Sequence, residues 1–322
     1  MCWSFKIQLV TFYKTGAMGA YDDCVFNTRW SHFSTLNGKL ENIANALTLV
    51  FILTSNSMLL YGLYKTKHTK GFTNKLFMVM SISDIICGCI VIPVYFANIY
   101  LVNDSDRCQQ LSQIEGYVYI FFSFSSSVNT MYLSIDRFVF IRYPFKYKQI
   151  FEKKRTLVLA LYISYSISTA FIILEADANE AFYICSLFLL AFVFVISIAL
   201  NVFLVKYIRK QNKEIRRLSN TYMQSSYQKR ATQTVMVITL VLVLTHLPQV
   251  GLLSRFLGLK QHLRPLDRSA ILYFHWARLL VLANAGMNAS IFISRNKPIL
   301  KLYRNQFKRL SILKSSFSSN RN

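Results

Sequence analysis

The sequence predicts an all-α membrane protein, a bundle of seven transmembrane helices followed by a short amphipathic eighth helix on the cytoplasmic side. The chain of 322 residues is 53% hydrophobic and only 16% charged, whereas soluble domains carry about 25% charged residues. Charges are also missing from long windows that reach or approach the roughly 20 apolar residues needed to cross a bilayer. A soluble core does not produce seven such windows separated by basic loops.

Three regions follow from this pattern. Residues 1–42 are expected to form an extracellular N-terminal segment, residues 43–296 the bundle, and residues 297–322 an amphipathic helix with a cytoplasmic tail. The expected spans are 43–64, 73–101, 109–141, 156–174, 183–208, 230–256 and 267–294. Beyond the last span, apolar side chains share one helical face and Lys and Arg lie opposite, a pattern typical of a helix on the membrane surface.

The net charge of +23 is distributed asymmetrically. The loops after the first, third and fifth spans, together with the tail, hold 27 of the 37 Lys and Arg residues. The positive-inside rule then predicts a multi-pass plasma-membrane protein with its N-terminus outside. A basic chain is also typical of nucleic-acid binding, but no soluble module remains to perform it. We therefore expect membrane lipids as partners and no nucleic acid.

The stretch SIDRFVFIRYPF, residues 134–145, places Asp136 and Arg137 side by side at the end of the third span. Ionisable residues within a membrane are costly and usually functional. A plain interfacial charge pair that anchors the helix is the simpler interpretation. With seven helices in this orientation, the stretch resembles the Asp-Arg-Tyr signature of rhodopsin-like (class A) G protein-coupled receptors.

Further positions resemble the same family. They are Asn56 in the first span, Asp84 in the second, Ser126 in the third, and Asn284 and Asn288 one turn apart in the seventh. The resemblance implies a polar pocket able to hold a sodium ion, with Asp84 and Ser126 as metal ligands, because hard cations prefer oxygen ligands. A satisfied polar network without an ion explains the same residues. No other cofactor is expected.

The resemblance also implies a switch that couples the bundle to a G protein. Pro248 matches the hinge proline of the sixth helix, Tyr207 matches a tyrosine of the fifth, and His246 stands where the family carries a tryptophan. In such receptors the sixth helix swings outward and Arg137 changes partners when a ligand favours the open state. A hydrogen-bonded core residue is the alternative interpretation of His246.

Several positions depart from the family pattern. Phe138 replaces the signature tyrosine, and Phe292 stands where the seventh helix carries a tyrosine. Gln228 stands where many members place an acid facing the arginine, so that inter-helix ion pair is expected to be absent.

The outer half of the bundle is expected to bind the ligand through Glu115, Tyr119 and Arg278. Arg278 is the one charge between residues 269 and 294 of the seventh span. It can receive a ligand carboxylate or phosphate through a bidentate contact, or it can pair with Glu115. Amine receptors carry an aspartate where Tyr119 stands, and opsins a lysine where Leu282 stands, so neither ligand class fits.

Two further expectations come from the resemblance alone. The family joins its third helix to the second outer loop by a disulfide, which implies a Cys108–Cys185 pair. Serines of the tail are candidate phosphorylation sites for a receptor kinase, which implies arrestin as a partner; an unmodified tail is the alternative.

The expected function is that of a receptor that binds an extracellular ligand and activates a heterotrimeric G protein through movement of the sixth helix. A seven-helix chemosensory channel or transporter is the alternative. Inverted chemoreceptors place the N-terminus inside, against the distribution of basic loops, and transporters usually have repeat-related halves. No hydrolytic triad, metal box or nucleotide-binding loop occurs in the sequence, so no enzyme activity is expected.

Overall fold

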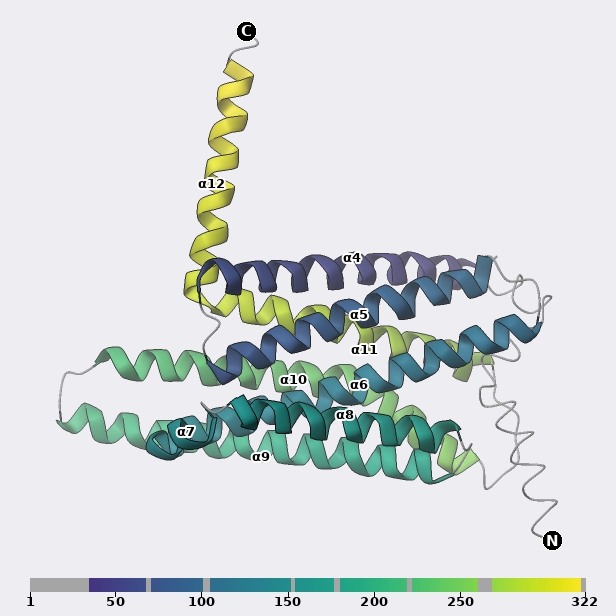
Figure 1. Cartoon of the computed structure of the whole chain (residues 1–322), viewed down its shortest axis with the longest axis horizontal. Helices are drawn as coiled ribbons and strands as arrows, with labels where there is room; N and C mark the ends of the chain where they lie inside the picture. The colour runs from purple at the N-terminus through teal and green to yellow at the C-terminus, as the bar shows by residue number, and fades with distance from the viewer. Residues whose placement is uncertain are drawn as a thin grey trace.

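The computed structural model describes residues 35–67, 71–100, 105–151, 154–176, 180–218, 222–259 and 268–319. Within these ranges the chain is helical apart from short turns and contains no strand. The helices are α4 (Leu36–Lys65), α5 (Phe72–Tyr100), α6 (Ser105–Arg142), α7 (Pro144–Phe151), α8 (Lys154–Ala176), α9 (Glu180–Leu218), α10 (Tyr222–Leu259), α11 (Arg268–Arg295) and α12 (Lys297–Ser319). The long helices lie roughly antiparallel in one bundle (Figure 1). The predicted all-α fold is confirmed.

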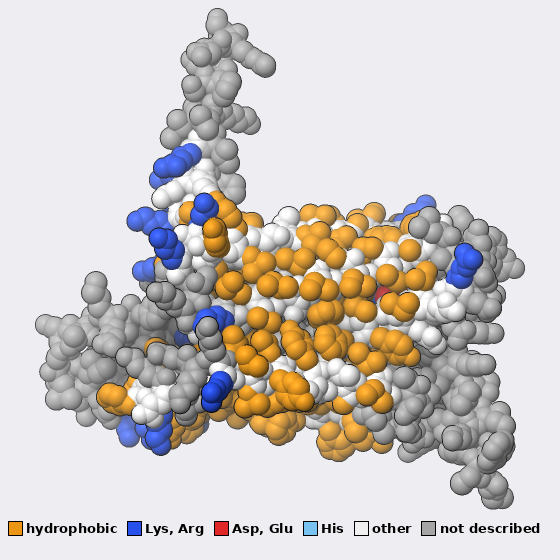
Figure 2. Space-filling view, in the orientation of Figure 1, with side chains coloured by type: hydrophobic (Ala, Val, Ile, Leu, Met, Phe, Trp, Pro, Cys, Tyr) orange, Lys and Arg blue, Asp and Glu red, His pale blue; other side chains and the backbone are white. Residues whose placement is uncertain are grey.

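Six of the described helices are long and apolar enough to cross a membrane: α4, α5, α8, α9, α10 and α11. Only 22% to 50% of the residues in their apolar windows are buried inside the bundle. The remaining apolar side chains cover the flanks of the molecule (Figure 2). Soluble monomers rarely expose so large a continuous apolar surface. The protein is therefore a helical bundle that spans a membrane several times.

Helix α6 is 38 residues long but is not among these six. Its middle carries the run SFSSSVNT, which lowers its hydropathy. Many of its polar side chains are buried, among them those of Ser125, Ser127, Asn129 and Thr130. The helix packs against α5, α8, α9 and α10. Because neighbouring helices shield α6 from the surroundings, its composition does not have to match that of a lipid-facing helix.

The two ends of the bundle differ in charge. Exposed Lys and Arg side chains gather where α4, α6, α9 and α11 end, at the left of Figure 2. We call this end the basic end and the opposite one the far end. An apolar cluster lies inside each half: Leu133, Val235, Ile238 and Phe292 belong to the cluster nearer the basic end.

The first helix begins earlier than the charge-free window suggested. Helix α4 starts at Leu36 rather than Ile43, and the hydroxyl of Thr35 caps it by accepting a hydrogen bond from the Gly38 amide at 3.3 Å. An N-cap side chain satisfies an amide that has no partner within the helix. As a result Glu41, assigned by the sequence to the extracellular segment, lies inside the bundle and is only 1% exposed.

Helix α12 leaves the basic end at a steep angle to the bundle (Figure 1). Its first turn docks on α4, where the fully buried Ile299 faces Gly62. The hydroxyl of Tyr303 donates to the Met58 carbonyl at 2.5 Å, and Gln306 donates to the Tyr61 hydroxyl at 3.2 Å. A helix therefore follows α11 directly and is anchored to the first helix of the bundle.

Gly286 sets the distance between α11 and α4. A β-carbon at this position lies 2.5 Å from the Phe51 ring, a contact that a rigid ring cannot relieve. We predict that Gly286→Ala lowers the free energy of unfolding by about 1–3 kcal/mol through overpacking. Thermal unfolding of the purified protein in detergent measures this loss. Gly251→Ala is the matched control, because its β-carbon meets nothing closer than the Tyr273 hydroxyl at 3.6 Å; equal effects of both changes contradict the prediction.

Candidate functional site

The Asp136 carboxylate is the centre of the basic end. It is completely buried and accepts hydrogen bonds from three directions. Its Oδ2 receives the Thr73 hydroxyl of α5 at 2.6 Å and Nε of Arg137 at 2.8 Å. Its Oδ1 receives the Tyr147 hydroxyl of α7 at 2.8 Å. The carboxylate therefore connects α6 to α5 through Thr73 and to α7 through Tyr147.

Arg137 is held against this carboxylate. Its guanidinium forms an ion pair with Asp136 at 2.7 Å, also donates to Thr73, and lies 5.3 Å from the centre of the Phe140 ring. Only 11% of its side chain is exposed. Burial and the adjacent Asp136 carboxylate raise the pKa of Tyr147, so its hydroxyl remains a proton donor to the pair. In this arrangement the guanidinium is occupied by Asp136 of its own helix and by Thr73 of α5.

Two other predicted switch residues, Tyr207 and Phe292, make aromatic contacts with residues outside this pair. The guanidinium of Arg142 lies 5.1 Å from the Tyr207 ring, so the arginine stacked on that tyrosine is Arg142. Phe292 packs against Phe77 of α5 with the ring centroids 4.1 Å apart. The side chain of Gln228 lies outside the described residues.

His246 is a buried core residue with partners on two helices. Its Nδ1 lies 2.9 Å from the Leu242 carbonyl, and its Nε2 lies 3.4 Å from the Ser127 hydroxyl of α6. A carbonyl can only accept, so Nδ1 carries the proton. The Ser127 hydroxyl beside Nε2 donates to the Ser123 carbonyl at 3.0 Å. The geometry agrees with the hydrogen-bonded core interpretation. Pro248 lies inside α10, half a turn further along.

The polar residues expected to form a cation pocket are all within the bundle. Asn56 donates to the Ala285 carbonyl at 3.3 Å and so ties α4 to α11. Asp84, Asn284 and Asn288 are buried, with 5%, 2% and 2% of their surfaces exposed. The Ser126 hydroxyl and the side-chain oxygens of Asn56, Asn284 and Asn288 are buried without a hydrogen-bond partner. Orphaned oxygens of this kind fit a hard cation or ordered water.

A transition-metal centre has no counterpart in the described part of the chain. No group of three or more His, Cys, Asp or Glu side chains comes together there. The side chains expected to form the pocket offer oxygens of carboxylate, hydroxyl and amide groups, the set that sodium and other hard cations prefer. The residues present therefore fit the ion that the sequence suggested.

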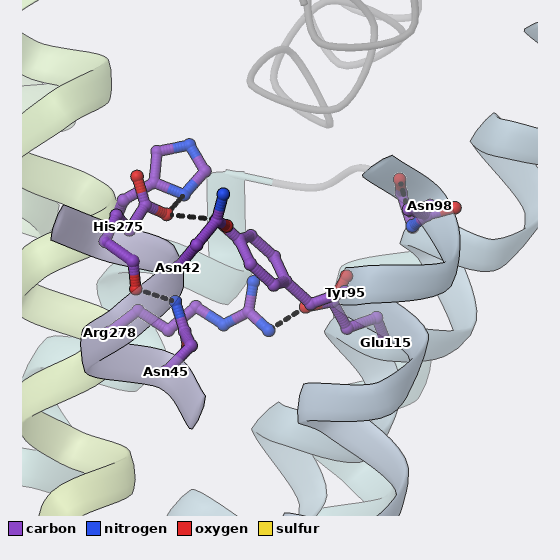
Figure 3. Close-up of polar contacts among 9 residues, drawn as sticks. Asn42, Asn45, Tyr95, Asn98, Glu115, His275 and Arg278 are labelled. Atoms are coloured by element: carbon purple, nitrogen blue, oxygen red, sulfur yellow. Dashed lines mark hydrogen bonds and ion pairs between the residues drawn. The ribbon is translucent and has the colours of Figure 1, made fainter. Parts of the chain in front are cut away.

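At the far end, Arg278 of α11 pairs with Glu115 of α6 (Figure 3). Its guanidinium also lies 5.3 Å from the centre of the Tyr119 ring. The Tyr119 hydroxyl donates to Gln249 of α10 at 3.4 Å. The Nε of Arg278 is buried and has no partner. The three residues predicted to bind ligand thus form one contact group. Of the two interpretations of Arg278, the structure shows the pair with Glu115.

A second far-end group was missed by sequence reasoning. Glu41 accepts from the Tyr95 hydroxyl at 2.7 Å and lies 3.1 Å from Nδ1 of His275 (Figure 3). It therefore joins α4, α5 and α11. The available signals were weak: Glu41 directly precedes the first charge-free window, and His275 lies three residues before Arg278.

The predicted Cys108–Cys185 disulfide is absent. Cys185 is exposed and its thiol is free. It lies within helix α9, which begins at Glu180. The side chain of Cys108 lies outside the described residues. Burial of Cys87 as a thiol, by contrast, agrees with its mid-helix position.

Residues 55–176 match the family model of the 7 transmembrane receptors of the rhodopsin family. The matched segment covers less than half of the chain, and within it the match agrees with the resemblance seen in the sequence. The matched segment contains Asn56, Asp84, Ser126 and the Asp136–Arg137 pair. It runs from within α4 to the end of α8. A comparison with curated proteins finds no significant match.

The Glu115–Arg278 pair gives a direct test of far-end packing. Glu115 is 5% exposed, so removing its partner leaves a buried charge alone. We predict that Arg278→Met lowers the free energy of unfolding by about 3 kcal/mol, and that adding Glu115→Gln restores most of it. Thermal unfolding in detergent measures both changes. Lys39→Met on exposed α4 surface is the control; a double variant no more stable than Arg278→Met contradicts the pairing.

Proposed function

We propose that the protein is a plasma-membrane receptor that binds an extracellular ligand at its far end and activates a heterotrimeric G protein at its basic end. The observation that carries the proposal is the state of Arg137. A guanidinium at the rim of the bundle is withdrawn into a buried ion pair, so a change of partner can bring it to the surface. The family match supports a receptor over the channel or transporter alternative.

The proposed receptor crosses the membrane seven times, with α6 as the span that its neighbours shield from lipid. The enrichment of Lys and Arg at the basic end supports a cytoplasmic location for that end and an extracellular N-terminus. Helix α12 then lies at the inner surface as the amphipathic eighth helix. Its exposed Lys301 and Arg304 suit contact with lipid head groups.

The basic end also has features of a protein-binding surface. Phe145 of α7 is 88% exposed and Tyr143 beside it is 43% exposed. Aromatic residues at a polar rim are typical anchors in protein interfaces. A G protein contacts this surface in the proposal, and a receptor kinase and arrestin act on the same side through the serines of the tail.

At the far end, the ligand competes for Arg278. A ligand carboxylate or phosphate replaces Glu115 on the guanidinium and also satisfies the buried Nε that has no partner. Bidentate contacts of this type are among the strongest hydrogen bonds in proteins. Tyr119 contacts both Arg278 and Gln249 of α10. Separation of Arg278 from Glu115 therefore alters a contact of α10 as well.

Release of Arg137 tests the proposal. We predict that Asp136→Asn raises basal nucleotide exchange on a co-expressed G protein roughly tenfold, since a charge-assisted hydrogen bond contributes about 1.5 kcal/mol or more. Arg137→Ala lowers exchange to the level of cells without receptor. Uptake of a labelled GTP analogue by membranes measures both, one G protein class at a time.

Lys301→Ala is the control, because Lys301 is an exposed cation of the same end outside the ion pair. Identical exchange by all variants with every G protein class, together with an ion conductance that depends on the chain, overturns the proposal in favour of a channel.

The polar pocket around Asp84 holds a sodium ion in the proposed resting state. Its oxygens come from α5, α6 and α11, so a bound cation favours the arrangement in which these helices are packed together. We predict that replacing sodium chloride by the chloride of a large organic cation raises basal exchange severalfold, and that Asp84→Asn abolishes this dependence. Cys87→Ala, one turn away and buried, is the control. Sodium dependence that survives in Asp84→Asn rules out this site.

A further inference from the structure

A polar contact joins α6, α9 and α10 one turn inside the Arg137 pair. The side-chain amide of Asn201 in α9 donates to the Thr239 hydroxyl of α10 at 3.0 Å and lies 3.3 Å from the Ser134 hydroxyl of α6. The two hydroxyls are themselves 3.4 Å apart. We call these three residues the latch.

The latch is shielded from water. Ser134, Asn201 and Thr239 are 1%, 5% and 3% exposed. The amide is fixed to its own helix by a 2.8 Å bond to the Ser197 carbonyl. In a membrane, packing and polar contacts hold helices together, because burial of apolar surface gives little preference for helix over lipid. The latch therefore contributes to the closed packing of the three helices.

Its position connects it to the proposed switch. Ser134 lies three residues before Arg137, on adjacent turns of α6. Thr239 lies one turn from Val235, which is 2% exposed in the apolar cluster of the basic end. Gln228 carries no charge, so α10 has no acid at the position where many relatives hold the arginine. Contacts other than an ion pair with Arg137 must therefore hold α10 against α6.

We propose that Asn201 is a positioning residue that holds α10 against α6 and thereby sets the basal level of G protein activation. The inference rests on the proposed function for its consequence and on the contacts above for its geometry. The Thr239 bond exists only while α10 is packed against its neighbours. Removing it therefore destabilises the closed arrangement and leaves the open one unchanged.

The asparagine also makes the contact reversible. Its Oδ1 is buried and has no partner in the closed arrangement. When α10 moves away, water reaches this oxygen and offsets part of the loss of the Thr239 bond. A contact with one orphaned acceptor is weaker than a fully satisfied one, which suits an element that has to open.

Reactivity of a cysteine placed at Val235 reports opening directly. Val235→Cys is buried in the closed arrangement, next to the basic end, and a water-soluble maleimide reaches it only when α10 moves. We expect Asn201→Ala and Thr239→Val each to increase labelling of full-length protein in membranes about tenfold, and to raise basal nucleotide exchange in parallel. Peptide mass spectrometry at position 235 separates this signal from that of the native cysteines.

Two controls distinguish a latch from general loosening. Thr239→Ser keeps the hydroxyl and should retain slow labelling, while Thr239→Val keeps the shape and should not. Ser197→Ala removes a buried hydroxyl of the same helix that has no partner, and should have no effect. Combining Asn201→Ala with Thr239→Val should add little to either alone, since both remove the same bond.

The outcomes separate the two proposals. Unchanged labelling in both Asn201→Ala and Thr239→Val rejects the latch whatever the exchange assay gives. Faster labelling without exchange on any G protein class supports the latch as a contact that closes the bundle and rejects the receptor function. If Asn201→Ala does not reach the membrane, the Thr239→Val and Thr239→Ser pair decides alone.

Discussion

The buried carboxylate of Asp136 is the interaction on which the basic end depends. A carboxylate without partners in a low-dielectric interior costs several kcal/mol, and this one is completely shielded. Thr73, Arg137 and Tyr147 satisfy it from two helices besides its own. The requirement for these donors determines how α5 and α7 pack against α6. It also keeps the guanidinium inside the protein, and the proposed receptor function depends on reversing that state.

Helix α6 has the role in this bundle that an apolar core has in a soluble domain. Because the outside of the bundle is as apolar as its inside, hydrophobic burial gives little preference for one helix arrangement over another. Polar contacts supply the preference. Those of α6 reach α11 through Glu115, α8 through Ser125, and α9 and α10 through Ser134. A serine-rich helix is therefore compatible with a membrane bundle only at its centre.

Helix α10 touches α6 at three levels. Gln249 meets Tyr119 at the far end, His246 meets Ser127 in the middle, and Thr239 meets Ser134 near the basic end. A rigid displacement of α10 therefore alters contacts in the proposed ligand region and in the proposed switch region together. This arrangement gives a physical route by which occupancy at one end biases the other, provided that the ligand binds the two arrangements with different affinity.

The sequence alone indicated the approximate positions of the helices and the adjacent charges Asp136 and Arg137, but it missed the start of α4 and the buried Glu41. Stretches without charge mark helices that face lipid, and Asp136 is adjacent to Arg137 in the chain. The partners were decided only by the tertiary structure. Thr73, Glu41 and Asn201 make their hydrogen bonds with residues of other helices. Cys185, which was expected to form a disulfide, is a free thiol. Such contacts depend on how each helix is rotated about its axis and how far it is shifted along it, and a local sequence pattern does not encode either.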